Sequence, residues 1–124
     1  MSFWRNEVIQ SALDRDVETA IAEQKAILER DPENPRAHFA LGTLSYFKGE
    51  IAAAIELFIQ AIALDSSYAA PHVSLGRLYA LQGNYDLAWQ HAREAERLGD
   101  PALVAQLERY PHLKPTRGPQ SAPK

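Results

Sequence analysis

The side chains of this chain that could do acid–base or metal chemistry near neutral pH are its histidines, His38, His72, His91 and His112. His38 and His72 stand in similar surroundings, at the start of two similar phrases. One interpretation is a stacked pair able to hold a metal ion, and the other is that each imidazole replaces an aromatic ring in helix packing. We favour packing, because no third ligand follows at the spacing of a metal site. His91 lies in the polar segment "QHAREAER", so we expect it to be solvated.

No other pattern of residues indicates catalysis. The sequence has no Gly-rich phosphate loop, no His-Glu-x-x-His motif and no Ser nucleophile in a recognisable setting. It contains no cysteine, which removes thiolate catalysis, disulfides and Cys-based metal sites. We therefore predict no catalytic residue, no metal and no cofactor. An enzyme that uses His38 and His72 remains a remote alternative.

Charge and hydropathy narrow the class of protein further. The net charge of the 124 residues is −3, but the segment from Pro111 onward holds three basic residues and no acid, so the body carries −6. An acidic body disfavours nucleic-acid binding, which depends on neutralising phosphates. No apolar run approaches the roughly 20 residues of a membrane-spanning helix, and the N-terminus lacks the features of a secretory signal. We expect a cytoplasmic protein that binds neither nucleic acid nor membrane.

A sequence repeat organises the elements that carry these side chains. The phrase "HFALGTLSYFKGE" at His38 returns as "HVSLGRLYALQGN" at His72. The 34 residues from His38 to His72 are one repeat length. Glycine in the middle of a helical pattern costs about 1 kcal/mol relative to alanine unless close packing needs it. We therefore assign the mid-helix glycines and the alanines that follow them in the next helix to a helix–helix contact, and the intervening glycines to a tight turn. The packing residues are Gly42, Ala54, Gly76 and Ala88, and the turn residues are Gly49 and Gly83.

This unit of helix, turn and helix resembles the tetratricopeptide repeat (TPR). The copy 35–68 matches the family pattern at Leu41, Gly42, Gly49, Ala54, Phe58 and Ala61, and the copy 69–102 matches it at Leu75, Gly76, Tyr79, Gly83, Ala88 and Ala95. A degenerate copy in 1–34 keeps Trp4, Ala20, Ile21 and Asp31-Pro32, but has Glu7, Val8 and Arg15 in place of the family's Leu, Gly and turn Gly.

The resemblance implies an all-α, right-handed α-solenoid of three TPR-like hairpins plus a C-terminal capping helix. We expect helices over 3–13, 16–30, 35–47, 51–64, 69–81, 85–97 and about 101–109. Asn34, Asn84 and Asp100 are suited to cap the helices that follow them, and the segment 65–67 offers another cap. Residues 1–110 form the predicted solenoid domain, and the Pro-rich segment 111–124 is expected to be a disordered tail.

In this family the first helix of each copy lines a concave binding groove. The inward positions hold no acidic residue, although the body is acidic. The side chains that the resemblance assigns to the groove are Arg5, Ile9, Leu13, Arg36, Phe39, Thr43, Tyr46, Phe47, Val73, Arg77 and Leu81, and the remaining inward positions hold Ser2, Ala12, Ala70 and Ala80. Five of these side chains can bury apolar groups of a ligand, and for two of the five the alternative role is to fill space between neighbouring repeats. The five are Phe39, Tyr46, Phe47, Val73 and Leu81. Ile9, Ala40, Ala70 and Ser74 occupy four places of the Lys/Asn carboxylate clamp of chaperone-binding members, so that clamp is not expected.

The groove predicts an adaptor that binds a partner protein or peptide of acidic and apolar character. Arginine can form a forked pair of hydrogen bonds with a carboxylate, and the apolar side chains can bury those of a peptide. The alternative is self-assembly, with copies joined through the ends of the stack or through Phe3 and Trp4. Covering the end of the repeat array is the favoured role for that aromatic pair.

Overall fold

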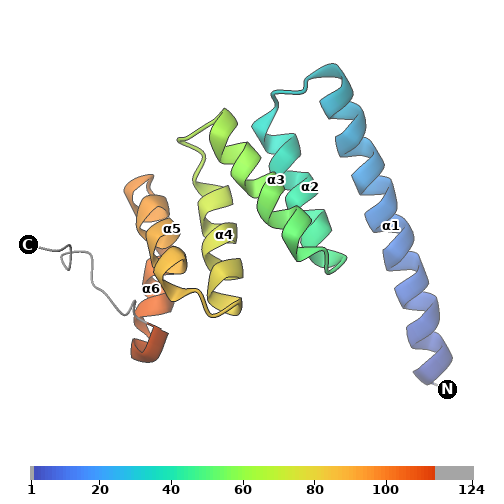
Figure 1. Cartoon of the computed structure of the whole chain (residues 1–124). Helices are drawn as coiled ribbons and strands as arrows, with labels where there is room; N and C mark the ends of the chain where they lie inside the picture. Colours follow the sequence, from blue (N-terminus) through green and yellow to red (C-terminus); the bar gives the residue numbers. More distant parts are fainter. Residues whose placement is uncertain (1, 114–124) are drawn as a thin grey trace, which may run out of the picture.

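The chain folds into a row of α-helices that leads from a long N-terminal helix to a short C-terminal one (Figure 1). This computed structural model describes the backbone of residues 2–113 and the side chains of residues 14–112. Within those residues the helices are α1 (Ser2–Arg30), α2 (Pro35–Phe47), α3 (Ile51–Leu64), α4 (Ala69–Leu81), α5 (Tyr85–Arg97), α6 (Ala102–Glu108) and the 3-10 helix η1 (Pro111–Leu113). In the described part of the chain, no helix is both long and apolar enough to cross a bilayer.

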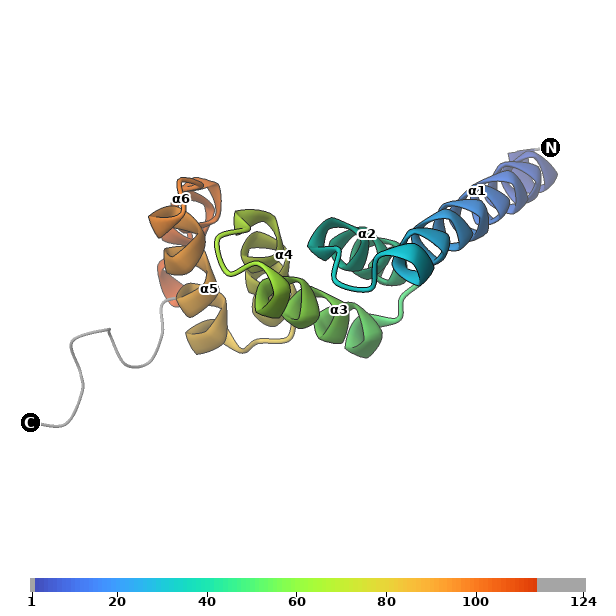
Figure 2. The same cartoon turned by 90° about the horizontal axis from the view of Figure 1, so that it is seen from above.

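Two helical hairpins form the centre of the molecule. Helix α2 packs on α3 and α4 packs on α5, while α3 joins the two hairpins by contacting α4. Seen from above, α2, α4 and α6 lie along one side of the row, and α3 and α5 lie along the other (Figure 2). The described residues form helices and no strand, as the predicted all-α repeat of helical hairpins requires, and the handedness of the solenoid stays a prediction.

Local sequence signals set the helix ends in both hairpins. The predicted bounds 35–47, 51–64, 69–81 and 85–97 are those of α2 to α5. Asn34 Oδ1 accepts from the Ala37 amide at 3.1 Å, and Asn84 Oδ1 accepts from the Leu87 amide at 3.3 Å. Gly49 and Gly83 connect the paired helices with φ angles of +79° and +81°. Glycine adopts this left-handed conformation without the penalty that a Cβ imposes.

Three predicted boundaries need correction. Asp65 accepts hydrogen bonds from the amide and hydroxyl of Ser67 in a local turn, so it does not cap α4, whose N-cap is Tyr68. Helix α6 runs from Ala102 to Glu108, with Asp100 accepting from the Ala102 amide at 3.1 Å. Residues 111–113, which we assigned to the tail, form η1 against α6. The remainder of that tail, 114–124, lies outside the described residues.

The prediction of separate helices at 3–13 and 16–30 is wrong. Helix α1 continues through Arg15 without a break, so the first copy contributes one long helix and not a hairpin. The reason is local. Arg15 stands one repeat length before Gly49, and a side chain there disfavours the left-handed turn that both glycines adopt. Helix α1 packs against α2, and an ion pair of 2.8 Å joins Glu18 to Lys48.

The helices pack tightly at the mid-helix glycines, where an added Cβ would collide with a neighbouring side chain. Gly42 is buried in α2, and a Cβ added there would lie 2.6 Å from Cε1 of Phe58 on α3. A Cβ at Gly76 would collide with the Leu103 side chain and would lie 3.2 Å from the Ala88 carbonyl oxygen. Ala54 and Ala88 are completely buried. Each glycine thus leaves space for an apolar side chain of a neighbouring helix to pack in the core.

We expect Gly42→Leu to be strongly destabilising. Its side chain must displace the Phe58 ring, and overpacking of this kind costs about 1–3 kcal/mol, occasionally more. Urea denaturation gives the change in the free energy of unfolding. The matched control is Ala52→Leu, which adds similar bulk at an exposed position of α3 and should leave stability nearly unchanged. A Gly42→Leu protein as stable as the parent would show that the ring does not need this space.

Candidate functional site

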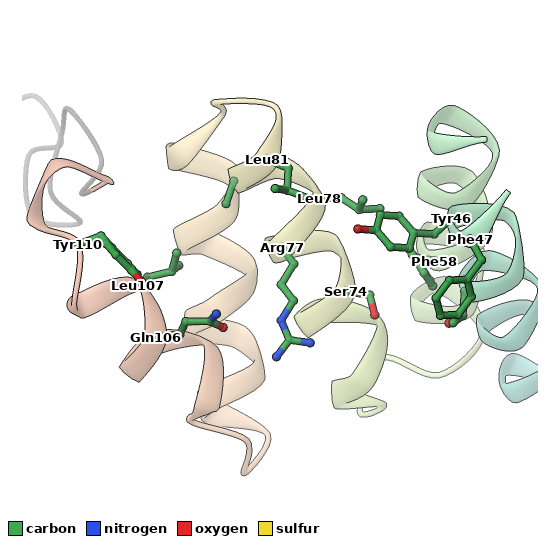
Figure 3. Close-up of a pocket in the computed structure, with 12 residues that line it drawn as sticks. Tyr46, Phe47, Phe58, Ser74, Arg77, Leu78, Leu81, Gln106, Leu107 and Tyr110 are labelled. Carbon is green, nitrogen blue, oxygen red and sulfur yellow. The ribbon is translucent and has the colours of Figure 1, made fainter. Parts of the chain in front are cut away.

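A groove opens on the side of the molecule formed by α2, α4 and α6. It has a volume of about 540 Å³. Figure 3 shows aromatic side chains of α2 and α3 at one end, α4 in the middle and α6 at the other end. The residues that line it are Thr43, Tyr46, Phe47, Phe58, Ser74, Arg77, Leu78, Ala80, Leu81, Gln106, Leu107 and Tyr110.

Exposed apolar side chains are concentrated in this groove. In the described part of the chain, five large hydrophobic residues are exposed, and four of them line it. Phe47 is 69% exposed, Leu81 73%, Tyr46 40% and Tyr110 49%. The fifth, Ile59, lies on α3 outside the lining. A contiguous exposed apolar patch of this kind typically marks a binding surface.

Arg77 supplies the charge in the groove. It is exposed on α4, and its side chain projects between Ser74 of the same helix and Gln106 of α6 (Figure 3). Among the described residues no carboxylate lies within salt-bridge distance of the guanidinium, and no lining residue is acidic. The groove therefore offers a cation and apolar surface together, with hydroxyl and amide groups beside them.

The groove contains five of the eleven side chains that the sequence assigned to it, namely Thr43, Tyr46, Phe47, Arg77 and Leu81. Phe39 instead packs its ring against Phe58 and Tyr68, at centroid distances of 5.5 and 5.4 Å. Val73 is buried in a cluster with residues of α5 and α6. These two fill space between repeats, which was the alternative role for two of the apolar residues.

Of the arginines assigned to the groove, Arg77 lines it and Arg36 does not. The Arg36 guanidinium lies over the Tyr68 ring, 5.1 Å from its centroid, and Arg36 is not among the lining residues. The side chains of Arg5, Ile9 and Leu13 lie outside those that the structure describes.

Sequence reasoning missed the contribution of α6. We treated that segment as a cap, yet Gln106, Leu107 and Tyr110 form one wall of the groove. The repeat itself carried the signal, because α6 begins 33 residues after α4, close to the 34 residues from the start of α2 to the start of α4. Helix α6 therefore occupies the place of the first helix of a further copy.

The burial of His72 and its ring contact with His91 agree with the packing role that we favoured for this residue. His38 and His72 do not form a stacked pair. Nε2 of His38 lies 3.0 Å from the Pro32 carbonyl oxygen, whereas Nδ1 of His72 lies 3.0 Å from Nδ1 of His91. His91 is partly buried, so its expected solvation on a polar face is wrong, and its ring stacks on Tyr79 of α4. The described residues contain no cluster of three potential metal ligands.

Burial lowers the pKa of both rings in the His72–His91 pair. For His91, a charge on His72 lowers the pKa further, while the nearby Glu94 carboxylate opposes these effects for both rings. Arg97 Nε donates to that carboxylate at 2.6 Å, and this hydrogen bond lowers the pKa of Glu94. The two Nδ1 atoms can share one proton in a hydrogen bond. Two protons would face each other across the interface between α4 and α5.

We expect acid to destabilise the fold through this pair. Because both pKa values are lower in the folded state, the unfolded chain binds more protons below the ordinary histidine pKa of about 6.5. The contribution of this pair to the free energy of unfolding should be fully present above that pH. It should be lost as the pH falls through the lowered pKa values of the folded state. Urea denaturation at pH 7.5 and 5.0 should show a loss of stability in the parent and a smaller loss in His91→Gln. His112→Gln, at an exposed position, should behave as the parent does. Equal pH dependence in all three proteins would contradict the assignment.

Comparison with known proteins identifies the repeat. A family model described as TPR repeat matches residues 44–83, which run from the second half of α2 through the turn after α4. No curated protein matches the chain closely enough to extend the comparison. The helical hairpins agree with this match. Together they confirm the tetratricopeptide-repeat assignment for residues 44–83 of the chain.

Proposed function

We propose that this protein is a protein-interaction adaptor that binds a partner's acidic and apolar segment in the groove between α2, α4 and α6. TPR repeats generally mediate protein–protein interaction. The observation that carries the finer proposal is that four of the five exposed large hydrophobic residues in the described chain converge on one groove. The protein then acts by binding and not by catalysis.

Apolar contacts would supply most of the affinity. Burying apolar surface contributes about 25 cal/mol per Å², and the aromatic rings of Tyr46, Phe47 and Tyr110 lose little conformational entropy when a partner covers them. Phe47 and Leu81 are more than two-thirds exposed, so most of their surface is available for burial. Phe47 ends α2, Leu81 ends α4 and Tyr110 follows α6, and this spread over three helices favours an elongated ligand such as a helix or an extended peptide.

Charge would supply the selectivity. A guanidinium with no carboxylate among its described neighbours can accept one from a ligand without breaking an existing ion pair. A basic segment would bring like charge to Arg77 and would find no acidic lining residue in compensation. The groove therefore favours ligands that combine Asp or Glu with large apolar residues.

Selection from a displayed peptide library would test this ligand class. The parent should enrich peptides that combine Asp or Glu with Leu, Ile or Phe. The same selection on the double variant Phe47→Ser/Leu81→Ser should lose this enrichment while the fold is retained, because both side chains are exposed. No enrichment by the parent, or a basic consensus, would contradict the proposed ligand.

We expect Arg77→Ala to weaken binding of the selected peptide by about 1.5–3 kcal/mol, the range for a charge-assisted hydrogen bond. Isothermal titration measures this change, and the parent's affinity should fall as salt rises. Arg93→Ala is the matched control, because it removes the same charge from α5, on the other side of the row. Equal affinities of parent and Arg77→Ala, or binding insensitive to salt, would show that the peptide uses another surface.

Self-association is the second candidate function. It is favoured by an observation on the N-terminal side of the repeat array. Some side chains there remain partly exposed, although the side chains at the matching positions of the later repeats are buried.

A further inference from the structure

Helix α6 forms one wall of the groove and is the last α-helix of the described chain. It packs on α5 and α4, and its buried side chains Leu103, Val104 and Leu107 join a cluster with residues of those two helices. With seven residues it is also the shortest α-helix among the described residues. Short terminal elements open at a lower free energy than the centre of a protein. The groove therefore depends on an element that opens easily.

The position of α6 depends in turn on the contact between α4 and α5. Leu103, the most deeply buried side chain of α6, packs where the side chain that Gly76 lacks would stand on α4. A Cβ at Gly76 would also lie 3.2 Å from the carbonyl oxygen of Ala88 and 3.6 Å from Cβ of His91, both on α5. Residues of both helices thus surround the Leu103 side chain. If α4 and α5 separate here, α6 loses this contact.

The His72–His91 pair lies in the same contact between α4 and α5. The two Nδ1 atoms are 3.0 Å apart, and the ring of His91 stacks on Tyr79, which packs against the cluster that contains Leu103. One proton between two nitrogens at this distance makes a hydrogen bond. With a proton on each Nδ1, two N–H groups and two positive charges face each other. The rings must then move apart.

The charges around the pair do not remove this repulsion. Among the described residues, the charged side chains that act on the pair are Glu94 and Arg97, both on α5 and none on α6. Glu94 favours the charged form of both rings, but Arg97 donates to its carboxylate and disfavours a charge on His72. Burial lowers the pKa of both rings, so the closed contact binds protons less readily than a separated pair does. Acid therefore favours separation.

We propose that protonation of both histidines separates α4 from α5 at the pair, releases α6 and opens the groove. The protein then holds its peptide near neutral pH and loses it in acid. This regulation rests on the proposed function, because it acts on the groove that binds the peptide. Release of α6 removes Gln106, Leu107 and Tyr110 from the lining. A histidine that takes up its proton only in the open state shifts the opening equilibrium by about 30-fold between pH 7.5 and 5.0.

Hydrogen exchange of the full chain without ligand tests the release of α6. Protection factors, which remove the pH dependence of intrinsic exchange, should fall for the α6 amides by up to about 30-fold from pH 7.5 to 5.0. Those of α2 and α3 should change much less. In His91→Gln the α6 amides should keep their protection, because a side-chain amide can either donate to Nδ1 of His72 or accept from it.

Two further variants complete the exchange experiment. His72→Gln is the reciprocal change and gives the same test if His91→Gln does not fold. His112→Gln, at an exposed position, should behave as the parent does. Unchanged protection of α6 in the parent, or an equal loss in the parent and the paired-site variants, would overturn the proposal. So would a loss in α2 and α3 as large as that in α6, because it would show global unfolding.

Isothermal titration connects the release of α6 to the groove. From pH 7.5 to 5.0, the dissociation constant of the peptide selected on the parent should rise by up to about 30-fold in the parent and by less in His91→Gln. Titration of the peptide's own carboxylates affects both proteins alike. An equal rise in both would overturn the regulation. Failure to select any peptide would contradict the proposed function alone, because the exchange experiment needs no ligand.

Discussion

The close approach of paired helices at glycine is the constraint on which the structure depends. At Gly42 the absent side chain makes room for the Phe58 ring, and at Gly76 it admits Leu103 and the backbone of α5. Glycine inside a helix costs about 1 kcal/mol relative to alanine, and here burial of Phe58, Leu103 and Ala88 offsets that cost. Because both hairpins close in the same way, α2, α4 and α6 lie along one side of the row, and their outer surfaces form the groove.

The first copy shows what happens when this constraint is absent. With Val8 and Arg15 at the contact and turn positions, no glycine supports either the close approach or the left-handed turn, and α1 runs straight. Helix formation is locally favourable at every step, because each residue added contributes one hydrogen bond. The result is a long helix that packs on α2 while Ala20 and Ile27 stay partly exposed.

The two faces of helix α4 have different roles, one in the groove and one in the histidine pair. Helix α4 presents Arg77 and Leu81 to the groove, while His72 on the same helix is buried against His91 of α5. The groove side has exposed apolar groups and a cation, so its chemistry is available to a ligand. The buried side has a polar pair satisfied within the protein, so it contributes to packing and to the pH dependence of stability.

The sequence by itself determined the helices of both full repeats, since capping asparagines mark where α2 and α5 begin and turn glycines follow the ends of α2 and α4. These are local signals, set by backbone conformation and hydrogen bonding within a few residues. The resemblance to the TPR also assigned Arg77, Phe47 and Leu81 to the groove, and these three are among the residues that line it. Only the tertiary structure decided that Phe39 and Val73 fill the core, that α6 forms a wall and that His72 meets His91. These outcomes depend on distances between helices, which the spacing of residues along one helix does not contain.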